Sequence, residues 1–181
     1  MPLPPLTTDR LLLRQRNLDD VPAILAMNTD PEVMRFVGDG RMPDPVELEK
    51  RTRERVGTDF GVGLGYWSVF PHERPDDYLG YVVLSPVPES VDIEISYGIR
   101  RDAWGHGFAT EAARAGLDFA FRARVLPEVV AVVHPDNISS QRVAKKLGFK
   151  AAGHRHAHGA DLFLYRLDRA AWPSLEHGRK H

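Results

Sequence analysis

The chain has 181 residues, of which 43% are hydrophobic and 27% are charged, and its formal net charge is −1. This length suits one globular domain, and the balanced charge argues against a nucleic-acid or membrane partner held by bulk electrostatics. Cysteine is absent, which excludes disulfides, zinc sites built on thiolates and a cysteine nucleophile.

The first part of the chain is predicted to form one strand followed by helices. Apolar and polar side chains alternate over residues 7–16 as in a strand, and Asn17 is predicted to cap the helix that follows. Pro31 opens a short second helix that ends near residue 36. The highly charged segment 46–56 is predicted to be a solvated surface helix.

Residues 57–97 change to the period of β-strands. Three apolar segments, 66–70, 79–84 and 91–97, are separated by turns rich in proline and aspartate. Their spacing predicts an antiparallel meander.

A long helix with small side chains on one face comes next. One stripe at helical spacing consists of Ala109, Ala112, Ala113, Gly116, Leu117, Ala120 and Phe121. Because most of these side chains are small, the helix is expected to pack unusually close to a sheet.

The last third of the chain alternates strands and helices. The predicted elements are a buried strand at 128–133, a helix at 137–147, a strand pair at 149–152 and 162–167, and a helical tail at 168–172. The whole chain, 1–181, is then expected to be a single α/β domain with its core at about 7–167. No apolar run approaches the ~20 residues that span a bilayer, and residues 1–5 lack the features of a signal peptide, so a cytoplasmic protein is expected.

A turn with two glycines joins the third meander strand to the long helix. The first N–H groups of a helix have no internal partners, and Gly105 and Gly107 allow the backbone to come close to a phosphate. Arg100 and Arg101, just upstream, are available to add positive charge. The turn is therefore predicted to bind a pyrophosphate.

A dinucleotide-binding unit is the alternative interpretation of this turn, since Asp136 follows near the end of the next strand. Thr110 stands where that motif has its third glycine. The preceding strand alternates polar and apolar residues, whereas a Rossmann first strand is buried on both faces. The remaining chain is also too short for the further βαβ units, so an oxidoreductase is the weaker alternative.

Residues 100–112 read Arg-Arg-Asp-Ala-Trp-Gly-His-Gly-Phe-Ala-Thr-Glu-Ala and resemble the acetyl-CoA motif of the GNAT acetyltransferases. Their Trp-Gly-x-Gly-Phe-Ala-Thr-Glu-Ala form is similar to the branch that acetylates the N-termini of ribosomal proteins. Further matches to that branch occur in family order at residues 8–14, 94–97, 137–140 and 146–149.

This resemblance implies a GNAT-like α/β fold, with a mixed, mostly antiparallel sheet of about six to seven strands flanked by helices. It implies acetyl-CoA as co-substrate, no metal, and direct attack by a primary amine in a ternary complex. The acceptor is a protein N-terminus or a small-molecule amine, and the chain is a monomer or homodimer. The cofactor contacts are expected at Ile99, Trp104, Gly105, His106, Gly107, Phe108, Ala109, Thr110 and Asn137.

Two positions depart from the broader family. Trp104 stands where that family often has arginine or glutamine, as is common in this branch. Ala144 stands where the broader family often has a tyrosine that protonates the departing thiolate. That role then falls to another residue or to water, and a catalytically idle acyl-CoA-binding module is a second alternative.

Glu94 is the predicted general base, because amine acetylation needs a proton acceptor close to the amine. It shares a strand face with Asp92, and burial beside that second carboxylate would raise the pKa values of both. A solvated Glu94 is the competing interpretation. Asp92, His134 and water are the alternative bases, although His134 also suits a structural turn.

Ser140 is the predicted hydrogen-bond donor or acid for the thiolate, since its spacing to Ala144 and Leu147 directs it inward. Its hydroxyl could instead cap the helix, a role that also suits Asn137. Three alternating histidines, His154, His156 and His158, are predicted to be surface or substrate-groove residues rather than metal ligands.

Overall fold

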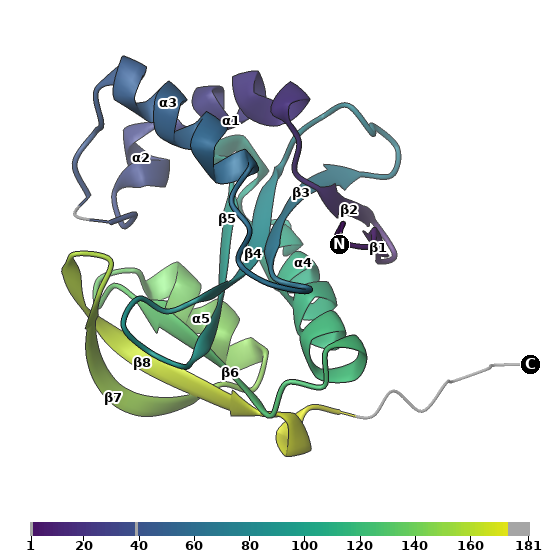
Figure 1. Ribbon diagram of the computed structural model, residues 1–181, viewed down its shortest axis with the longest axis vertical. Helices are drawn as coiled ribbons and strands as arrows, with labels where there is room; N and C mark the ends of the chain where they lie inside the picture. Colours follow the sequence, from purple (N-terminus) through teal and green to yellow (C-terminus); the bar gives the residue numbers. More distant parts are fainter. Residues whose placement is uncertain (1, 39, 174–181) are drawn as a thin grey trace, which may run out of the picture.

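The computed structural model describes residues 2–38 and 40–173 (Figure 1). One mixed sheet of eight strands has the order β1-β2-β3-β4-β5-β6-β8-β7. The strands are β1 (Leu6–Thr7), β2 (Leu11–Gln15), β3 (Gly65–Pro71), β4 (Gly80–Pro86), β5 (Ile93–Ile99), β6 (Glu128–Val133), β7 (Lys150–Ala157) and β8 (Ala160–Asp168). The helices are α1 (Val21–Asn28), α2 (Pro31–Met34), α3 (Pro45–Val56), α4 (Phe108–Asp118) and α5 (Ile138–Lys146).

The predicted meander is confirmed, because β2 to β5 pair antiparallel in sequence order. The single strand predicted over residues 7–16 is wrong. The chain turns back between β1 and β2, where the Leu11 N–H donates to Thr8 Oγ1 (2.9 Å) and the Thr8 N–H to the Leu11 carbonyl (2.9 Å). Splitting that segment makes the sheet eight strands wide instead of six to seven.

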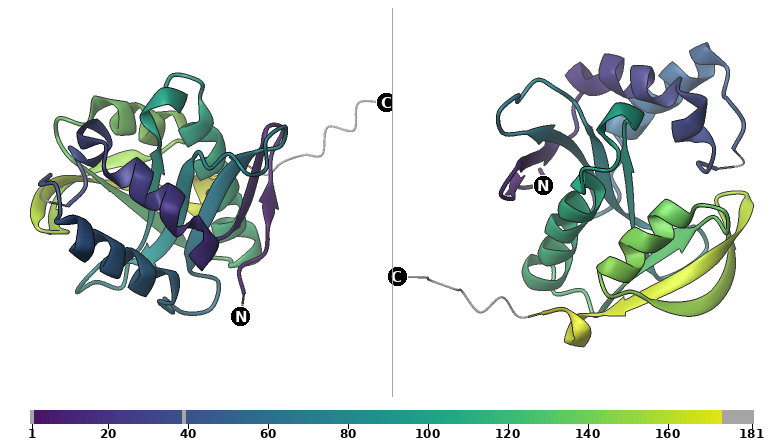
Figure 2. Two further views of the ribbon diagram at one scale, coloured as in Figure 1. Left: turned by 90° about the horizontal axis from the view of Figure 1, so that it is seen from above. Right: turned by 180° about the vertical axis from the view of Figure 1, so that it is seen from behind.

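Helices cover both faces of the sheet (Figure 2). Helices α4 and α5 lie on one face, where their buried side chains join those of β2 to β6 in the main core. Helix α1 packs on the other face, with Ile24 and Met27 against Phe70 and Tyr78. Asn17 is confirmed as a cap, although it caps the 3₁₀ turn Leu18–Asp20 that leads directly into α1: it accepts from the Asp19 N–H and completes a capping box with Asp20.

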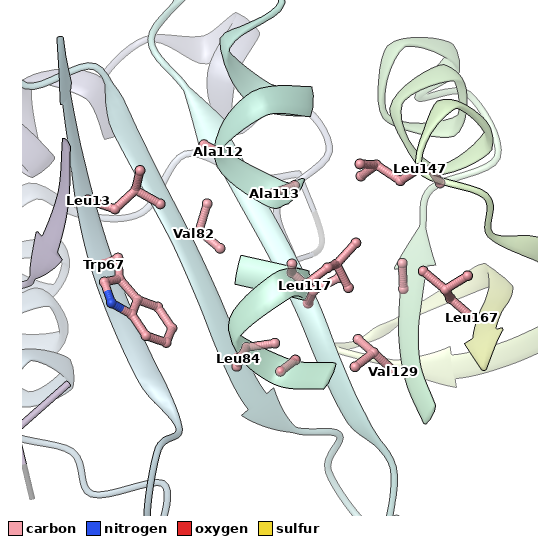
Figure 3. Packing of buried hydrophobic residues seen from close by; sticks show 14 of the residues in the cluster. Leu13, Trp67, Val82, Leu84, Ala112, Ala113, Leu117, Val129, Leu147 and Leu167 are labelled. Atoms are coloured by element: carbon pink, nitrogen blue, oxygen red, sulfur yellow. The ribbon is translucent and has the colours of Figure 1, made fainter. Parts of the chain in front are cut away.

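The small-residue face of α4 is confirmed as the contact with the sheet (Figure 3). Ala112, Ala113 and Leu117 have no solvent-exposed surface. A Cβ atom added at Gly116 would lie 2.9 Å from Val82 Cγ1 and 3.3 Å from Ile95 Cδ1. The absent side chain therefore sets how closely α4 approaches β4 and β5.

The C-terminal elements appear in the predicted order, but the last strand pair is longer than expected. His154 and His156 lie in β7, whereas His158 lies in the turn to β8 with a φ of 52°. The three histidines therefore do not share one strand face. The predicted helical tail is one 3₁₀ turn at Arg169–Ala171. None of the helices in the described part of the chain is long and apolar enough to cross a membrane.

The close approach of α4 predicts the effect of Gly116→Val. The added side chain meets β4 and β5, so we expect the free energy of unfolding to fall by about 1–3 kcal/mol, the usual cost of overpacking a core. Urea unfolding measures this change. Gly57→Ala is the control, since a Cβ there lies an ordinary 3.7 Å from the nearest atom. Equal stability of Gly116→Val and wild type would contradict the packing argument.

Candidate active site

The glycine turn leaves a row of backbone N–H groups free at the start of α4. After β5 ends at Ile99, a 3₁₀ turn leads to Gly105 and Gly107, which have φ angles of 82° and 81°. The N–H groups of Gly105, His106 and Gly107 make no hydrogen bond within the described residues. A Cβ at Gly105 would meet nothing within 4 Å. The turn thus has the open backbone and unpaired donors that a phosphate requires.

Side chains from two distant segments hold this turn in place. Trp104 Nε1 donates to the Ile99 carbonyl (2.6 Å), which ties the turn to the end of β5. Arg10 donates from Nη1 to the His106 carbonyl (3.0 Å) and forms an ion pair with Glu111 (2.5 Å). Burial alone would raise the pKa of Glu111, but hydrogen bonds from Thr8 and Arg10 outweigh it and lower the pKa. The segment between β1 and β2 therefore braces the first turn of α4, which sequence reasoning missed.

The two arginines upstream of the turn are engaged elsewhere. Arg100 pairs with Asp77 (2.5 Å) and Asp102 (2.9 Å), and Arg101 pairs with Asp30 (3.0 Å). Because carboxylates already balance their charges, the backbone N–H groups and the helix dipole are the main anion-binding features of the turn.

Strands β5 and β6 part shortly after they meet (Figure 1). They are parallel, and Glu94↔Val130 is their one register pair among the described residues. Across the opening, the Tyr97 hydroxyl donates to the Ser140 carbonyl (3.1 Å). Burial raises the pKa of Tyr97, which keeps this donor protonated. The two strands are therefore separate over the part of β5 that leads to the glycine turn.

Helix α5 borders this opening with its first turn. Asn137 Oδ1 accepts from the Ser140 N–H (3.0 Å), so the capping role of Asn137 is confirmed. The Ser140 hydroxyl makes no hydrogen bond within the described residues, so it is not used as a cap. Ser140 is half-buried and Ala144 fully buried, as their helical spacing predicted.

Glu94 is buried, with 3% of its surface exposed, so the solvated interpretation is wrong. His158 Nε2 lies 2.9 Å from Glu94 Oε1 and 3.1 Å from Oε2. The pair lies on the sheet face opposite α4, because Ile95, the next residue along β5, faces Gly116. Sequence reasoning missed His158 as a partner of Glu94, since 64 residues separate them and no motif links them.

The prediction that Asp92 and Glu94 raise each other's pKa is wrong for Asp92. This carboxylate precedes β5 and forms ion pairs with Arg155 (2.7 Å) and Arg166 (3.4 Å). The hydrogen bond from Arg155 lowers the pKa of Asp92. Because Asp92 is paired with two guanidinium groups and its pKa is lowered, it is a poor proton acceptor.

The remaining histidines have structural partners. His134 Nδ1 accepts from the Asp136 N–H (3.1 Å) in the turn before α5, and its ring lies 5.1 Å from that of Phe36. His154 contacts Phe163, and His156 pairs with Asp161 (2.7 Å). Within residues 2–38 and 40–173, no cluster of three or more histidine or acidic side chains could hold a metal ion.

Comparisons with known proteins agree with this arrangement. A family model described as an acetyltransferase (GNAT) domain matches residues 10–150. The uncharacterized protein YkkB of Bacillus subtilis (strain 168) is 32% identical over 150 residues, which are 79% of this chain and 83% of that protein. An acetyltransferase structure from Agrobacterium tumefaciens is 26% identical, with a TM-score of 0.78 over 92% of this chain and 95% of its own.

The structure of RimL, a ribosomal L7/L12 α-N-protein acetyltransferase in complex with coenzyme A, shares the fold. It is 16% identical, with a TM-score of 0.73 over 93% of this chain and 99% of its own. Fold and family together define an acyl-CoA-dependent N-acyltransferase. The chain belongs to the GNAT acetyltransferase family, and the oxidoreductase alternative is wrong.

The Glu94–His158 pair predicts a pH-dependent contribution to stability. The hydrogen bond to Glu94 raises the pKa of His158, although burial opposes this. A raised folded pKa stabilises the fold fully below the unfolded value of about 6.5, and the contribution is lost as pH rises through the folded value.

We therefore expect His158→Asn, which tolerates the left-handed backbone, to reduce the free energy of unfolding at pH 5.5 by up to about 1 kcal/mol. The difference should shrink by pH 9, as urea unfolding at the two pH values will measure. His156→Asn is the control, because that ring and Asp161 are both exposed. A destabilisation that does not change with pH would contradict the prediction.

Proposed function

We propose that this enzyme transfers an acetyl group from acetyl-CoA to a primary amine, by direct attack in a ternary complex. The observation that carries the proposal is the layout of β5, which has the buried Glu94 near its start and the phosphate turn after its end. The five residue steps from Glu94 to Ile99 extend about 17 Å along the strand. An extended pantetheine arm would span this length between the turn and the reacting centre.

The glycine turn suits the phosphate groups of the cofactor. Unpaired N–H groups at Gly105, His106 and Gly107 would donate to the pyrophosphate, followed by the first N–H groups of α4. The other proposed cofactor contacts are Ile99, Trp104, Phe108, Ala109, Thr110 and Asn137. Trp104, which is 47% exposed, flanks the turn, while Ile99 and Asn137 lie at the ends of β5 and α5 that border the opening.

Two side chains supply the proton chemistry in this proposal. Acetyl-CoA brings the activated thioester. Glu94 accepts the proton of the attacking amine, directly or through one water, while His158 holds its carboxylate in position. The Ser140 hydroxyl, which has no partner in the described chain, donates to the departing sulfur in place of the tyrosine that Ala144 replaces.

The other candidate bases suit the role less well. Asp92 is held by two arginines, and His134 uses Nδ1 to close a turn. For the acceptor, both a protein N-terminus and a small-molecule amine fit the proposal. RimL is named as an acetyltransferase of a protein N-terminus, but its identity of 16% supports a shared fold and not a shared acceptor.

Gly107→Val tests the cofactor turn. The left-handed φ of Gly107 disfavours a β-branched residue, so the donors at the start of α4 should be displaced. We expect calorimetric binding of coenzyme A to be lost while the circular dichroism spectrum is unchanged. Gly153→Val is the control, because Gly153 has a φ of 101° and open space but lies in β7. Undiminished affinity in Gly107→Val would remove the turn from the cofactor site.

Glu94→Gln tests the base, since glutamine keeps the shape of the side chain and loses the proton acceptor. We expect acetylation near neutral pH to slow by about 10²–10⁴-fold, the usual contribution of general-base catalysis. The defect should shrink at alkaline pH, where the amine is already deprotonated. Free-thiol detection across a pH series measures this, over a panel of amines and peptides.

Asp92→Asn is the companion variant, and its rate should stay within a few-fold of wild type. A constant defect of Glu94→Gln at every pH would point to acceptor binding instead. Coenzyme A binding with no thiol release from wild type on any acceptor would favour an idle binding module.

A further inference from the structure

The sheet face opposite α4 carries a row of side chains that leads from the edge of β2 toward Glu94. The Arg16 N–H donates to the Tyr66 carbonyl (3.0 Å), which places Arg16 opposite Tyr66. The register continues the row from Tyr66 through Val83 to Ser96, which is two residues from Glu94 on the same face of β5. Arg16 and Glu94 therefore lie on one face, at opposite sides of the meander.

Arg16 is a buried cation that lies against tyrosine rings. It is 7% exposed, and its guanidinium group lies 4.0 Å from the ring centroid of Tyr66 and 5.3 Å from that of Tyr81. Among the described residues it makes no ion pair, and its Nε has no hydrogen-bond partner. The nearby carboxylate of Asp20 is engaged by Arg14 (2.6 Å) and by Ser68 (2.8 Å). Burial of an unpaired charge is costly, and stacking on tyrosines offsets only part of that cost.

A cavity of about 330 Å³ opens beside this guanidinium group. Its lining includes Arg16, Tyr66 and Arg55, which lies in the last turn of α3, and the loop that follows α3. Arg55 is exposed and has no ion pair within the described residues. Asp59 is the carboxylate of the lining, and its Oδ1 accepts from the Gly61 N–H (2.8 Å). Two unpaired arginines against one carboxylate make the cavity positive.

Arg16, which lines the cavity, lies on the same face of the sheet as Glu94. Helix α3, which carries Arg55, packs against α1, and α1 covers the face of the sheet opposite α4. The buried hydroxyl of Tyr78 lies beside Arg16, whose charge and hydrogen bonding act to lower the pKa of Tyr78 against the larger effect of burial. Arg16 and the donors around it thus lie on the face of the sheet that also carries Glu94.

We propose that Arg16 and Arg55 bind an oxyanion of the acceptor, so the enzyme acetylates amines that also carry a carboxylate group. This inference rests on the proposed function. Stacking on two rings fixes the plane of Arg16, and a planar guanidinium group suits bidentate contact with a carboxylate. Roughly 14 Å of sheet separates the backbones of β2 and β5, which favours a carboxylate several bonds from the amine, as in a short peptide or an ω-amino acid.

The test compares acceptors that differ in the anion alone. Each dipeptide and ω-amino acid is assayed beside its carboxamide, O-phosphoethanolamine beside ethanolamine, and spermidine serves as a polyamine. We expect kcat/KM for the acids to exceed that for the amides by at least tenfold, mainly through KM. A preference for O-phosphoethanolamine over every carboxylate acceptor would overturn the carboxylate as the bound group and show that the oxyanion is a phosphate. Equal rates for acids and amides, or a preference for spermidine, would overturn the inference while the proposed function stands.

Variants then assign the preference to residues. Arg16→Gln should remove the preference for acids over amides, and Arg16→Lys should retain part of it. If Arg16→Gln does not fold, Arg55→Gln tests the assignment instead, because the Arg55 side chain is exposed and its replacement should not disturb folding. Arg55→Gln should reduce the preference for acids severalfold. Arg53→Gln is the matched control, since Arg53 is also on α3 but pairs with Glu49 at the surface (2.8 Å). A preference that survives both Arg16→Gln and Arg55→Gln would contradict the assignment.

Binding is measured in parallel, so that failure of catalysis is distinguishable from failure of this inference. With coenzyme A present, calorimetry should show tighter binding of the acids than of the amides, whether or not turnover occurs. Acids bound more tightly without thiol release would overturn the proposed reaction and keep the anion site. Acids and amides bound equally would overturn the anion site.

Discussion

The close contact between α4 and strands β4 and β5 is the constraint on which the site depends. Gly116 lets the helix approach until Val82 and Ile95 occupy the space of its missing side chain. The helix begins where the glycine turn ends, so this contact also sets the position of the unpaired N–H groups relative to β5. The ion pair between Arg10 and Glu111 holds the same end of α4 from the other side. The strand, the turn and the helix are thereby held together by packing on one side and by an ion pair on the other.

The two faces of the sheet differ in the chemistry of the side chains they bury. The face under α4 and α5 is apolar and supplies the main core. The opposite face carries buried charges, each of which needs compensation because a carboxylate or guanidinium group is poorly tolerated away from water. Asp20 has Arg14, and Glu94 has His158. Arg16 lies against two tyrosine rings and makes no ion pair with the described residues, which distinguishes it from the other buried charges.

Local signals explain which predictions were confirmed. The caps at Asn17 and Asn137, the small face of α4 and the two left-handed glycines each depend on residues close together in the chain. Longer-range features were predicted less well. The turn between β1 and β2 is braced by hydrogen bonds from Thr8 and Arg10 to Glu111, about a hundred residues away, so the alternation of residues 7–16 alone suggested one strand.

The sequence by itself determined the family, the order of elements from β3 onward and the position of the glycine turn, because periodicity, glycines and caps act over a few residues. Only the tertiary structure decided the state of the charged groups. Asp92 and Glu94 lie two residues apart, yet they have different partners. Asp92 forms ion pairs with arginines of β7 and β8, whereas Glu94 pairs with a histidine in the turn between those strands. Such pairings follow from how strands are placed side by side. For the same reason, the sequence could not show that Arg16 makes no ion pair within the described part of the chain, because this depends on which side chains the fold places beside it.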